Sequence, residues 1–361
     1  MPILSRHSLL PLTARLRATF QRIRSVPESA HESIELAAAD EAPTLPAIAL
    51  PNEFDRVLGV GPSSTIDAEK RIITAKSLKH GPTIAYRVDD AILADHTCYW
   101  SGGYEVSKAR KKRALLTGAY DEYAEGQLCT YAPSNIYFGH WLRDAMAMEL
   151  LAEQRGLLPL SFEGTPWMHE LGYRQLMELP GHPISYARIR RLWVMDDLGL
   201  NSNWISRFKE LRARVRRKTN TGGPRHIFLA RGFTGTAREL LNAPNIVELL
   251  SARGFTVVTP ETLSPQAIVQ SLAAAKIVVA VEGSALNHAQ FALPEQAGVL
   301  VIQPPTRFNA FHKILFDFNR IRFGYLVAEP ASNGFIVDPD RLLRTLDLIE
   351  SELTKQAEWR Y

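Results

Sequence analysis

The sequence predicts an α/β protein with two domains and a C-terminal helix, and three observations support this class. The chain has 361 residues, which is more than one ordinary domain of about 150 residues holds. From residue 225 onward, short apolar runs alternate with helical segments, as is typical of a parallel sheet covered on both faces. Near the end, Leu342, Leu343, Leu346, Ile349 and Leu353 share one helical face, which predicts a packed final helix.

Composition excludes several classes of protein. Hydrophobic residues make up 46% of the chain and charged residues 22%, which is ordinary globular usage and excludes disorder throughout. No apolar run approaches the roughly 18 to 20 residues that a membrane span needs. The formal net charge of +4 does not by itself indicate a nucleic-acid partner. Cys98 and Cys129 lie in no CxxC pair, which favours a reducing compartment over a disulfide scaffold.

Residues 1–52 are predicted to be a basic amphipathic N-terminal segment followed by a linker. The first 27 residues have apolar side chains at helical spacing, several arginines and no acid. Arg15 and Arg17 interrupt the apolar core that a signal peptide would need. Two interpretations stay open for this segment: a basic tail, free or docked on a partner, or a helix lying on an anionic membrane surface. Residues 25–52 are rich in Pro, Ala, Ser and acids and show no sustained period.

Residues 53–218 are predicted to form the first α/β domain. Strands are expected at 84–88, 91–100, 127–131 and 192–195, and helices at 137–154 and 204–217. Basic clusters at 108–113 and 207–218 are interpreted as solvated helix faces, because residues 209–218 lack the aromatic side chains that nucleic-acid binding favours. The break at 219–224 (TNTGGP) marks the boundary to the next domain.

Residues 219–335 are predicted to form the second α/β domain, and residues 336–361 the C-terminal helix. Strands are expected at 226–230, 255–259, 277–281, 299–303 and 322–328, with helices at 243–253, 265–275, after Gly283, and at 311–318. Ligands of such sheets bind beyond the carboxyl ends of the strands, which points to residues 230–232, 260–261, 282–284 and 303–306.

Nucleotide-binding signatures are mostly absent from the sequence. No GxGxxG follows a strand and no P-loop occurs, so a dinucleotide-dependent enzyme is not expected. The string Asp338-Pro339-Asp340 resembles a metal-binding DxD, but we interpret Asp338 as a helix cap and Pro339 as the first helical residue. Gly283 and Ser284 follow the central predicted strand, where glycine and the next backbone N–H groups favour an anion site. The alternative is a βα turn that simply requires glycine.

A polar group is predicted where the helix at 137–154 begins. His140 and Asp144 are four residues apart and share one helical face, with Arg143 beside them. The pair could be a surface or capping contact, or it could handle a proton. In the second case, either Asp144 takes the proton directly or His140 takes it while Asp144 fixes its tautomer.

Together and in this order, these strings resemble glycosyltransferase family 61, which includes capsular-polysaccharide biosynthesis proteins. The resemblance covers roughly residues 80–330. Its first block is Asn135 with residues 139–144, its second is Arg231, Arg238 and Asn242 with residues 254–261 (GFTVVTPE), and its third is the loop at 283–288. One departure is Glu282, since many members have histidine at this position.

The resemblance implies a GT-B architecture, in which two Rossmann-like domains face a cleft. It also implies an inverting, metal-independent hexosyl- or pentosyltransferase of bacterial capsule or surface-polysaccharide biosynthesis, with a nucleotide-sugar donor and a saccharide or glycolipid acceptor. No cofactor or metal is expected, because Arg side chains and helix N–H groups can neutralise the departing diphosphate. The implied donor-binding residues are Arg231, Arg238, Glu261, Gly283, Ser284, Asn287 and His288. His140 and Asp144 are the candidate bases.

The expected location is the cytoplasm, with residues 1–27 as the segment that would touch the inner membrane. A different class stays open, a non-catalytic nucleotide- or polyanion-binding protein that uses the basic clusters. An epimerase acting on nucleotide-sugars is a further alternative.

Overall fold

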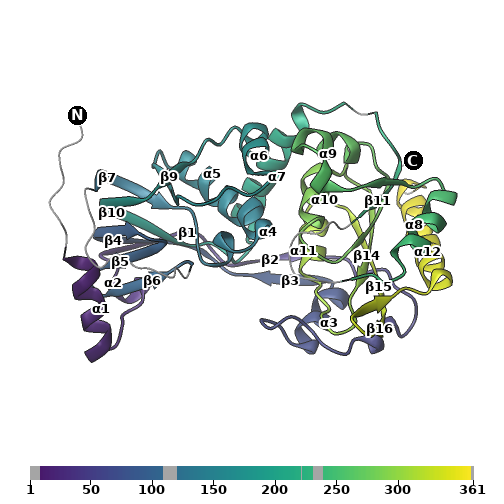
Figure 1. Ribbon diagram of the computed structural model, residues 1–361, viewed down its shortest axis with the longest axis horizontal. Helices are drawn as coiled ribbons and strands as arrows, with labels where there is room; N and C mark the ends of the chain where they lie inside the picture. Colours follow the sequence, from purple (N-terminus) through teal and green to yellow (C-terminus); the bar gives the residue numbers. More distant parts are fainter. Residues whose placement is uncertain (1–8, 109–119, 221, 231–238, 359–361) are drawn as a thin grey trace. The chain divides into compact units, whose positions relative to one another are not determined.

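The structure is a computed structural model that describes residues 9–108, 120–220, 222–230 and 239–358. The chain divides into two compact units (Figure 1). The first unit comprises Met1–Glu41 and Lys79–Leu211, and the second comprises Ala42–Leu78 and Arg212–Tyr361. Each unit contains helices and its own sheet with parallel strands, so the predicted α/β class is confirmed.

The first unit is built on a mixed sheet with the strand order β6-β5-β4-β10-β7-β8-β9, in which β1 also pairs with β4. The strands are β1 (Glu32–Ala37), β4 (Thr83–Ala94), β5 (Thr97–Trp100), β6 (Gly103–Val106), β7 (Asp121–Leu128), β8 (Pro159–Phe162), β9 (His182–Ile184) and β10 (Tyr186–Asp196). Strands β10, β7, β8 and β9 are mutually parallel, whereas β1, β4, β5, β6 and β10 pair antiparallel. Only the parallel half therefore resembles the Rossmann-like sheet expected for this domain.

The predicted linker at 25–52 is wrong, because this segment contains regular structure. Helix α2 (Val26–Ser29) is followed by β1, which pairs with the N-terminal half of β4, and by β2 (Asp40–Pro43), which pairs with β3 (Ser77–His80). Glu32 on β1 forms an ion pair with Arg87 on β4. Strand β1 is partly exposed along its length, so it lacks the apolar alternation by which strands are recognised.

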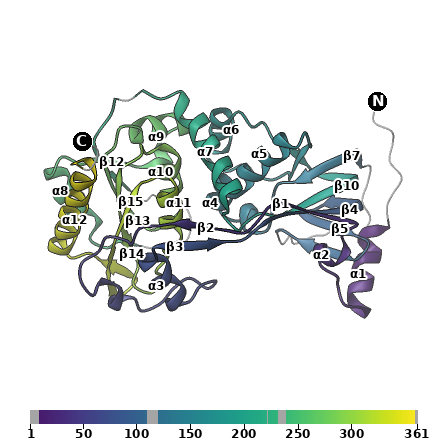
Figure 2. The ribbon, with the colours of Figure 1, turned by 180° about the vertical axis from the view of Figure 1, so that it is seen from behind.

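Helix α1 (Leu10–Phe20) confirms the predicted N-terminal helix, and Figure 2 shows it beside β5. The helix buries Pro11 and Ala14, and Ala14 packs in a cluster with Tyr99. Arg15 donates a hydrogen bond to the Tyr99 hydroxyl, and its guanidinium carbon lies 5.3 Å from the centre of that ring. A different stripe, Leu9, Leu16 and Phe20, stays exposed.

The second unit has a wholly parallel five-stranded sheet in the order β12-β11-β13-β14-β15. The strands are β11 (His226–Leu229), β12 (Thr256–Val258), β13 (Ile277–Val281), β14 (Gly298–Gln303) and β15 (Arg322–Val327). The helices are α8 (Ala243–Ala252), α9 (Pro265–Leu272), α10 (Leu286–Ala292), α11 (Phe311–Phe318) and α12 (Pro339–Glu358). Each agrees with a sequence-predicted element to within a few residues.

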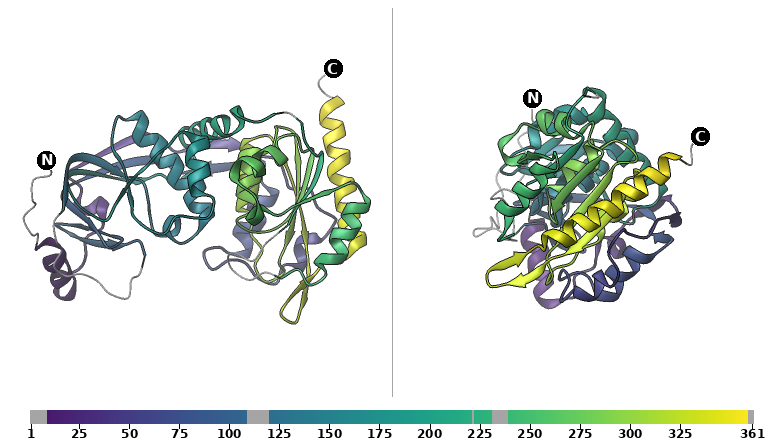
Figure 3. Two further views of the ribbon diagram at one scale, coloured as in Figure 1. Left: turned by 45° about the horizontal axis from the view of Figure 1, so that its top comes forward. Right: turned by 90° about the vertical axis from the view of Figure 1, so that its right-hand side faces the viewer.

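Helices cover both faces of this sheet because its strands are apolar on both faces. Alternate residues of β13, such as Ile277 and Val279, pack in one cluster with side chains of α8 and α12. Helices α9, α10 and α11 lie on the other face (Figure 1), and Figure 3 shows α12 lying across the sheet. The chain leaves β11 in one direction to β12 and later returns to β13 on its other side. This reversal is a topological switch point, where α/β sheets bind ligands.

Residues 42–78 group with the second unit, whereas the sequence analysis divided them between the linker and the first domain. The N–H of Ile48 donates to Phe323 O at 2.9 Å, and the N–H of Tyr325 donates to Ile48 O at 3.0 Å. This segment thus extends the sheet beyond β15 and also carries a 3₁₀ helix, η1 (Glu53–Arg56), and α3 (Ile66–Thr74).

The basic cluster at 207–218 lies on α7 (Ser202–Arg217), and its interpretation as a solvated face is wrong for two arginines. Arg207 and Arg212 are both buried. Arg212 and Arg216 donate to the carbonyls at the C-terminal end of α10, including Phe291 O at 3.4 Å from Arg212. Cationic side chains at this position stabilise the helix dipole. The cluster at 108–113 falls almost wholly outside the described residues.

Candidate active site

The predicted helix at 137–154 is confirmed, with a local departure from α-helical geometry at the polar residues. Helix α4 (Phe138–His140) continues into a π-helical turn, Trp141–Ala145, and then into α5 (Met146–Gln154). Such π turns inside helices are frequent at functional sites, because the extra residue changes the direction of side chains. His140 directly precedes this turn, and Asp144 lies within it.

His140, Arg143 and Asp144 form one hydrogen-bonded cluster with Tyr131. His140 Nδ1 lies 2.9 Å from Asp144 Oδ2. Arg143 donates to both carboxylate oxygens of Asp144, at 2.6 Å and 2.8 Å. The Tyr131 hydroxyl donates to Asp144 Oδ2 at 2.5 Å and lies 2.8 Å from His140 Nδ1.

The electrostatics of the cluster keep Asp144 ionised. Burial disfavours the charged carboxylate, but the Arg143 guanidinium and the hydrogen bonds from His140 and Arg143 hold the pKa of Asp144 well below its usual range. Burial and the adjacent Asp144 charge raise the pKa of Tyr131 well above its ordinary value. Asp144 is therefore an anion and Tyr131 a neutral hydroxyl at any pH near neutral.

Solvent access distinguishes the two predicted bases. The side chain of His140 is 39% exposed, whereas that of Asp144 is 4% exposed. Nδ1 lies close both to the carboxylate and, at 3.0 Å, to Nη2 of Arg143. Of the two neutral tautomers, the one that donates from Nδ1 to the carboxylate leaves Nε2 as the basic atom. This arrangement can accept a proton from a hydroxyl group, with Asp144 fixing the tautomer and stabilising the imidazolium that forms.

Tyr131 was missed by the sequence analysis, although a signal for it exists. The residue lies three positions beyond the carboxyl end of β7, in the parallel half of the first sheet, where ligand sites are expected. A 3₁₀ turn at Pro133–Asn135 holds it, with Asn135 Nδ2 donating to Tyr131 O at 3.1 Å. The family-pattern residue Asn135 therefore positions Tyr131.

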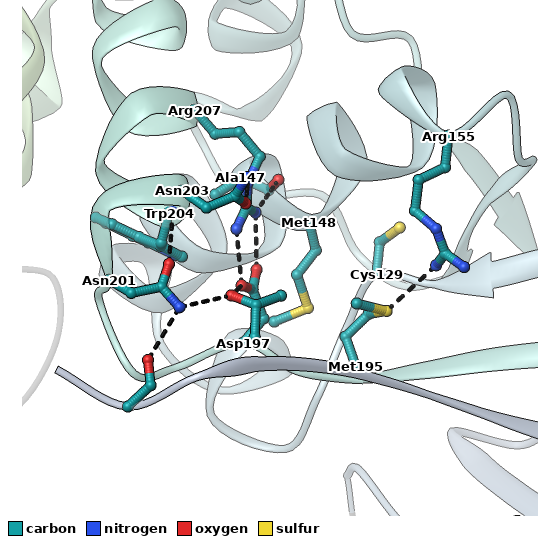
Figure 4. Close-up of polar contacts among 12 residues, drawn as sticks. Cys129, Ala147, Met148, Arg155, Met195, Asp197, Asn201, Asn203, Trp204 and Arg207 are labelled. Carbon is teal, nitrogen blue, oxygen red and sulfur yellow. Dashed lines mark hydrogen bonds and ion pairs between the residues drawn. The ribbon is translucent and has the colours of Figure 1, made fainter. Parts of the chain in front are cut away.

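Buried contacts fix the helix that carries the cluster (Figure 4). Arg207 on α7 donates to both oxygens of Asp197 at 2.7 Å and to Ala147 O on α5 at 2.9 Å. Gln127 Nε2 donates to Met148 O, also on α5, at 2.9 Å. The side chains of Arg207 and Asp197 are 1% and 0% exposed, so this ion pair is part of the core.

The predicted anion-binding turn lies in the second unit, directly after β13. Gly283 has a φ of 151°, which favours glycine because other residues rarely adopt it. Ser284 is exposed, whereas Asn287 and His288 are buried on α10. Asn287 Nδ2 donates to Ser284 O at 2.9 Å, which fixes the turn. The turn thus lies at the switch point of the sheet.

The remaining predicted donor residues fall partly outside the described chain. Arg231 and Arg238 lie in the range 231–238, which is not among the described residues. Glu261 lies in a 3₁₀ turn, Pro260–Thr262, that follows β12. Since β11, β12 and β13 are parallel, Glu261 and Gly283 follow strands that end at the same edge of the sheet. Asn242, another residue of the family pattern, exchanges two hydrogen bonds with the backbone of Val337 and so anchors the chain before α12.

Two further observations concern metals and membranes. Within residues 9–108, 120–220, 222–230 and 239–358, no three His, Cys, Asp or Glu side chains group so that they could hold a metal ion. None of the helices in this described part combines the length and apolar character needed to cross a bilayer.

Asp338 accepts a hydrogen bond from the N–H of Asp340 at 2.9 Å, which confirms its predicted role as a helix cap.

Comparison with known families identifies the class of this α/β protein. Residues 138–300 match the family model described as Glycosyltransferase 61, over a range that begins at α4 and ends within β14. This match includes His140, Asp144 and the Gly283 turn. The matched region is therefore a glycosyltransferase domain. Over these residues the chain is similar to glycosyltransferase family 61.

Comparisons with individual proteins add less. No curated protein matches the chain. Similar solved structures include two mutants of a flavo di-iron protein from Thermotoga maritima, in which a histidine is replaced by asparagine or by alanine. They are 10% and 11% identical, with a TM-score of 0.28, and each alignment covers 60% of this chain and 50% of the other. The chain thus spans about half the length of these structures.

Proposed function

We propose that the protein is an inverting, metal-independent glycosyltransferase in which His140 is the base that activates the acceptor hydroxyl. The observation that carries this proposal is the 2.9 Å contact between His140 Nδ1 and Asp144 Oδ2. It directs the other ring nitrogen of a partly exposed imidazole away from the buried carboxylate. Inversion requires one base to take the acceptor proton during in-line attack, and such a histidine suits this task.

Asp144 is the weaker of the two candidate bases. Its carboxylate is buried and accepts hydrogen bonds from Arg143 and Tyr131, and its depressed pKa makes it a poor proton acceptor. We assign it the role of holding His140 in one tautomer. The sequence analysis left both residues open, and burial and charge favour His140.

The donor is proposed to be a nucleotide-sugar bound at the switch point of the second unit. Gly283 and Ser284 offer a close backbone approach to a diphosphate, and Arg231 and Arg238 are proposed to neutralise its charge. Glu261 would accept hydrogen bonds from ribose hydroxyls. The buried side chains of Asn287 and His288 are proposed to hold the turn in place. Asn287 Oδ1 has no hydrogen-bond partner within the described part of the chain.

The finer architecture and setting belong to the same proposal. We propose a GT-B architecture, with the base in one α/β unit and the donor in the other, and a cytoplasmic enzyme of surface-polysaccharide assembly. The setting rests on the resemblance to capsular-polysaccharide biosynthesis proteins. Helix α1, with exposed Leu16 and Phe20 and the exposed Arg17, supports a peripheral contact with an anionic membrane.

The alternative of a polyanion-binding protein has less support. Arg207 and Arg212, which belong to the basic cluster on which it depended, are buried and engaged with Asp197 and with helix carbonyls. Buried guanidinium groups with internal partners are not available to an external polyanion.

The proposed function is tested by incubating the protein with a panel of nucleotide-sugars in the presence and absence of EDTA. We expect slow hydrolysis of one donor without acceptor, and transfer with inverted anomeric configuration when a saccharide acceptor is added, as read by NMR. Product with retained configuration, or activity that EDTA abolishes, would contradict the mechanism. An epimerised sugar would instead identify the enzyme as an epimerase.

A further inference from the structure

A cavity lies in the first unit, and none of the residues assigned to catalysis lines it. Its volume is about 750 Å³, within the range of known ligand pockets. One wall is the segment 22–28, which includes α2, and the other is formed by strands β4, β5, β6 and β10. Figures 1 and 2 both show α2 beside β5 and β6. His140, Asp144 and Tyr131 do not line this cavity.

The N-terminal wall is held in place by specific contacts. Ser25 and Glu28 form a reciprocal capping box at the start of α2, and Arg22 forms an ion pair with Glu28 at 2.8 Å. The N–H of Arg24 donates to Gly102 O at 3.1 Å, and Val26 packs into the main core cluster of the sheet. These contacts join the wall to the β5–β6 turn, so the cavity is a built feature of the fold.

Aromatic and hydrogen-bonding groups line the opposite wall. Tyr86 and Tyr104 are partly exposed, and Trp100 is buried behind them. Trp100 Nε1 makes no hydrogen bond within the described part of the chain. The indole of Trp100, together with the rings of Tyr86 and Tyr104, gives this wall its aromatic surface. Such aromatic rings present apolar faces with polar edges.

The charge of the lining excludes an anionic ligand. Glu28, Glu105 and Asp196 line the cavity together with the single guanidinium of Arg22, which is already paired with Glu28. A phosphate or diphosphate would meet an excess of negative charge here. Carboxylates beside aromatic rings instead suit a neutral polyol, because each carboxylate accepts several hydroxyl hydrogen bonds.

We propose that this cavity binds a neutral saccharide, namely a segment of the acceptor chain distant from the hydroxyl that receives the sugar. The choice of saccharide as occupant rests on the proposed function, whereas the exclusion of nucleotides rests on the charge of the lining. The site supplies affinity for a chain acceptor and takes no part in proton transfer.

The proposal is tested by titrating the full-length protein, without donor, with maltotriose, cellotriose, xylotriose and chitotriose in a calorimeter. We expect at least one trisaccharide to bind. Glu105→Gln should weaken that binding about tenfold, the usual loss for a charge-assisted hydrogen bond. Glu35→Gln is the matched control, since Glu35 is an exposed acid of β1 that does not line the cavity. It should leave the affinity unchanged.

A second pair of variants separates binding from folding. Trp100→Phe keeps an aromatic side chain but replaces the larger indole that lines the cavity, and should weaken binding about fivefold. Trp193→Phe removes a buried indole N–H of β10 that is already bonded to Glu125. This control variant should leave trisaccharide binding unchanged. Absence of binding to every trisaccharide would overturn the proposal. Equal losses of trisaccharide affinity in the test and control variants would overturn it as well. So would a result in which His140→Ala weakens trisaccharide binding and the cavity variants do not. Competition by uridine diphosphate with the trisaccharide would overturn it too. Donor hydrolysis by His140→Ala tests the proposed function independently of these results.

Discussion

Asp144 Oδ2, within the π-helical turn that separates α4 from α5, lies 2.9 Å from Nδ1 of His140, the last residue of α4. The contact joins a buried anion to a partly exposed imidazole, which is the arrangement of an oriented base. We expect His140→Ala to lower turnover by about 10²–10⁴, the usual contribution of general base catalysis, with little change in donor affinity. Steady-state kinetics and donor titration on the same preparation check this.

The control for this variant is His182→Ala. His182 Nε2 lies 2.9 Å from the Tyr123 hydroxyl, a contact like that of His140 with Tyr131, but no carboxylate contact accompanies it in the described chain. Near wild-type turnover in His140→Ala would show that another residue is the base. Asp144→Asn should lose turnover and also lower the unfolding midpoint, because it leaves the buried Arg143 charge without its partner.

The Gly283 turn leads to a prediction on donor binding. Gly283→Ala places a side chain at a φ of 151°, so the turn should distort and nucleotide affinity should fall. Arg231→Ala should weaken nucleotide binding by about 1.5–3 kcal/mol, the range for a hydrogen bond to a charged group. Calorimetry with and without EDTA measures both. Unchanged affinity in Arg231→Ala, or loss of binding in EDTA, would count against the metal-free donor site.

Helix α1 leads to a prediction on membrane association. Phe20 is 83% exposed and Leu16 is 53% exposed, on a helix that is itself packed through Ala14. The double variant Leu16→Gln, Phe20→Gln should reduce co-sedimentation with phosphatidylglycerol vesicles at low salt, while turnover on a soluble acceptor stays unchanged. Leu171→Gln, at an equally exposed leucine of α6 (Glu170–Met177), is the control. Equal pelleting of all three proteins would exclude a membrane role for this stripe.

The Arg207–Asp197 pair leads to a prediction on stability. Both side chains are buried and joined by two hydrogen bonds, so Asp197→Asn leaves a guanidinium without its counter-charge. The expected loss is about 3–5 kcal/mol in the free energy of unfolding. Urea denaturation measures it, and the exposed pair Arg253–Asp347 provides the comparison, where Asp347→Asn should cost less than about 1 kcal/mol. Similar losses at the two sites would refute the structural role given to Arg207.

The two cysteines lead to a prediction on reactivity. Burial raises the pKa of both the Cys98 and the Cys129 thiols, with a further increase from Glu105 and Glu149 respectively. Because only the thiolate reacts, native protein at mildly alkaline pH should resist iodoacetamide, and denatured protein should take up two labels. Mass spectrometry of intact protein counts the labels. Rapid labelling of the native protein would show that one thiol is accessible.

The sequence predicted the second unit far better than the first, for a physical reason. Its strands, such as Ile277–Val281, are apolar on both faces and are bounded by glycine, proline and capping residues such as Ser264, so pattern and structure coincide. Strand β1 instead depends on pairing with β4, and the intervening residues 42–78 belong to the second unit. No local pattern reports such a pairing.

The candidate site was predictable only in part. Helical spacing placed His140 and Asp144 together, because four residues along a helix return to one face even where the helix changes to a π turn. Tyr131 reaches the same cluster from the end of a strand, and the burial that separates the roles of the two candidate bases depends on the whole unit. Spacing alone could therefore name the pair but could not assign its roles.

The grouping of residues 42–78 with the second unit has a consequence for the synthesis of the protein. Glu53 accepts a hydrogen bond from the N–H of Val327, 274 positions later. A ribosome adding about 5 to 20 residues per second therefore translates for tens of seconds before residues 42–78 can pair with β15. Until β15 emerges, that segment lacks the hydrogen-bond partners that this strand supplies. We infer that the second unit matures only as the chain is completed, and that truncation before β15 leaves an early segment that cannot reach its native state.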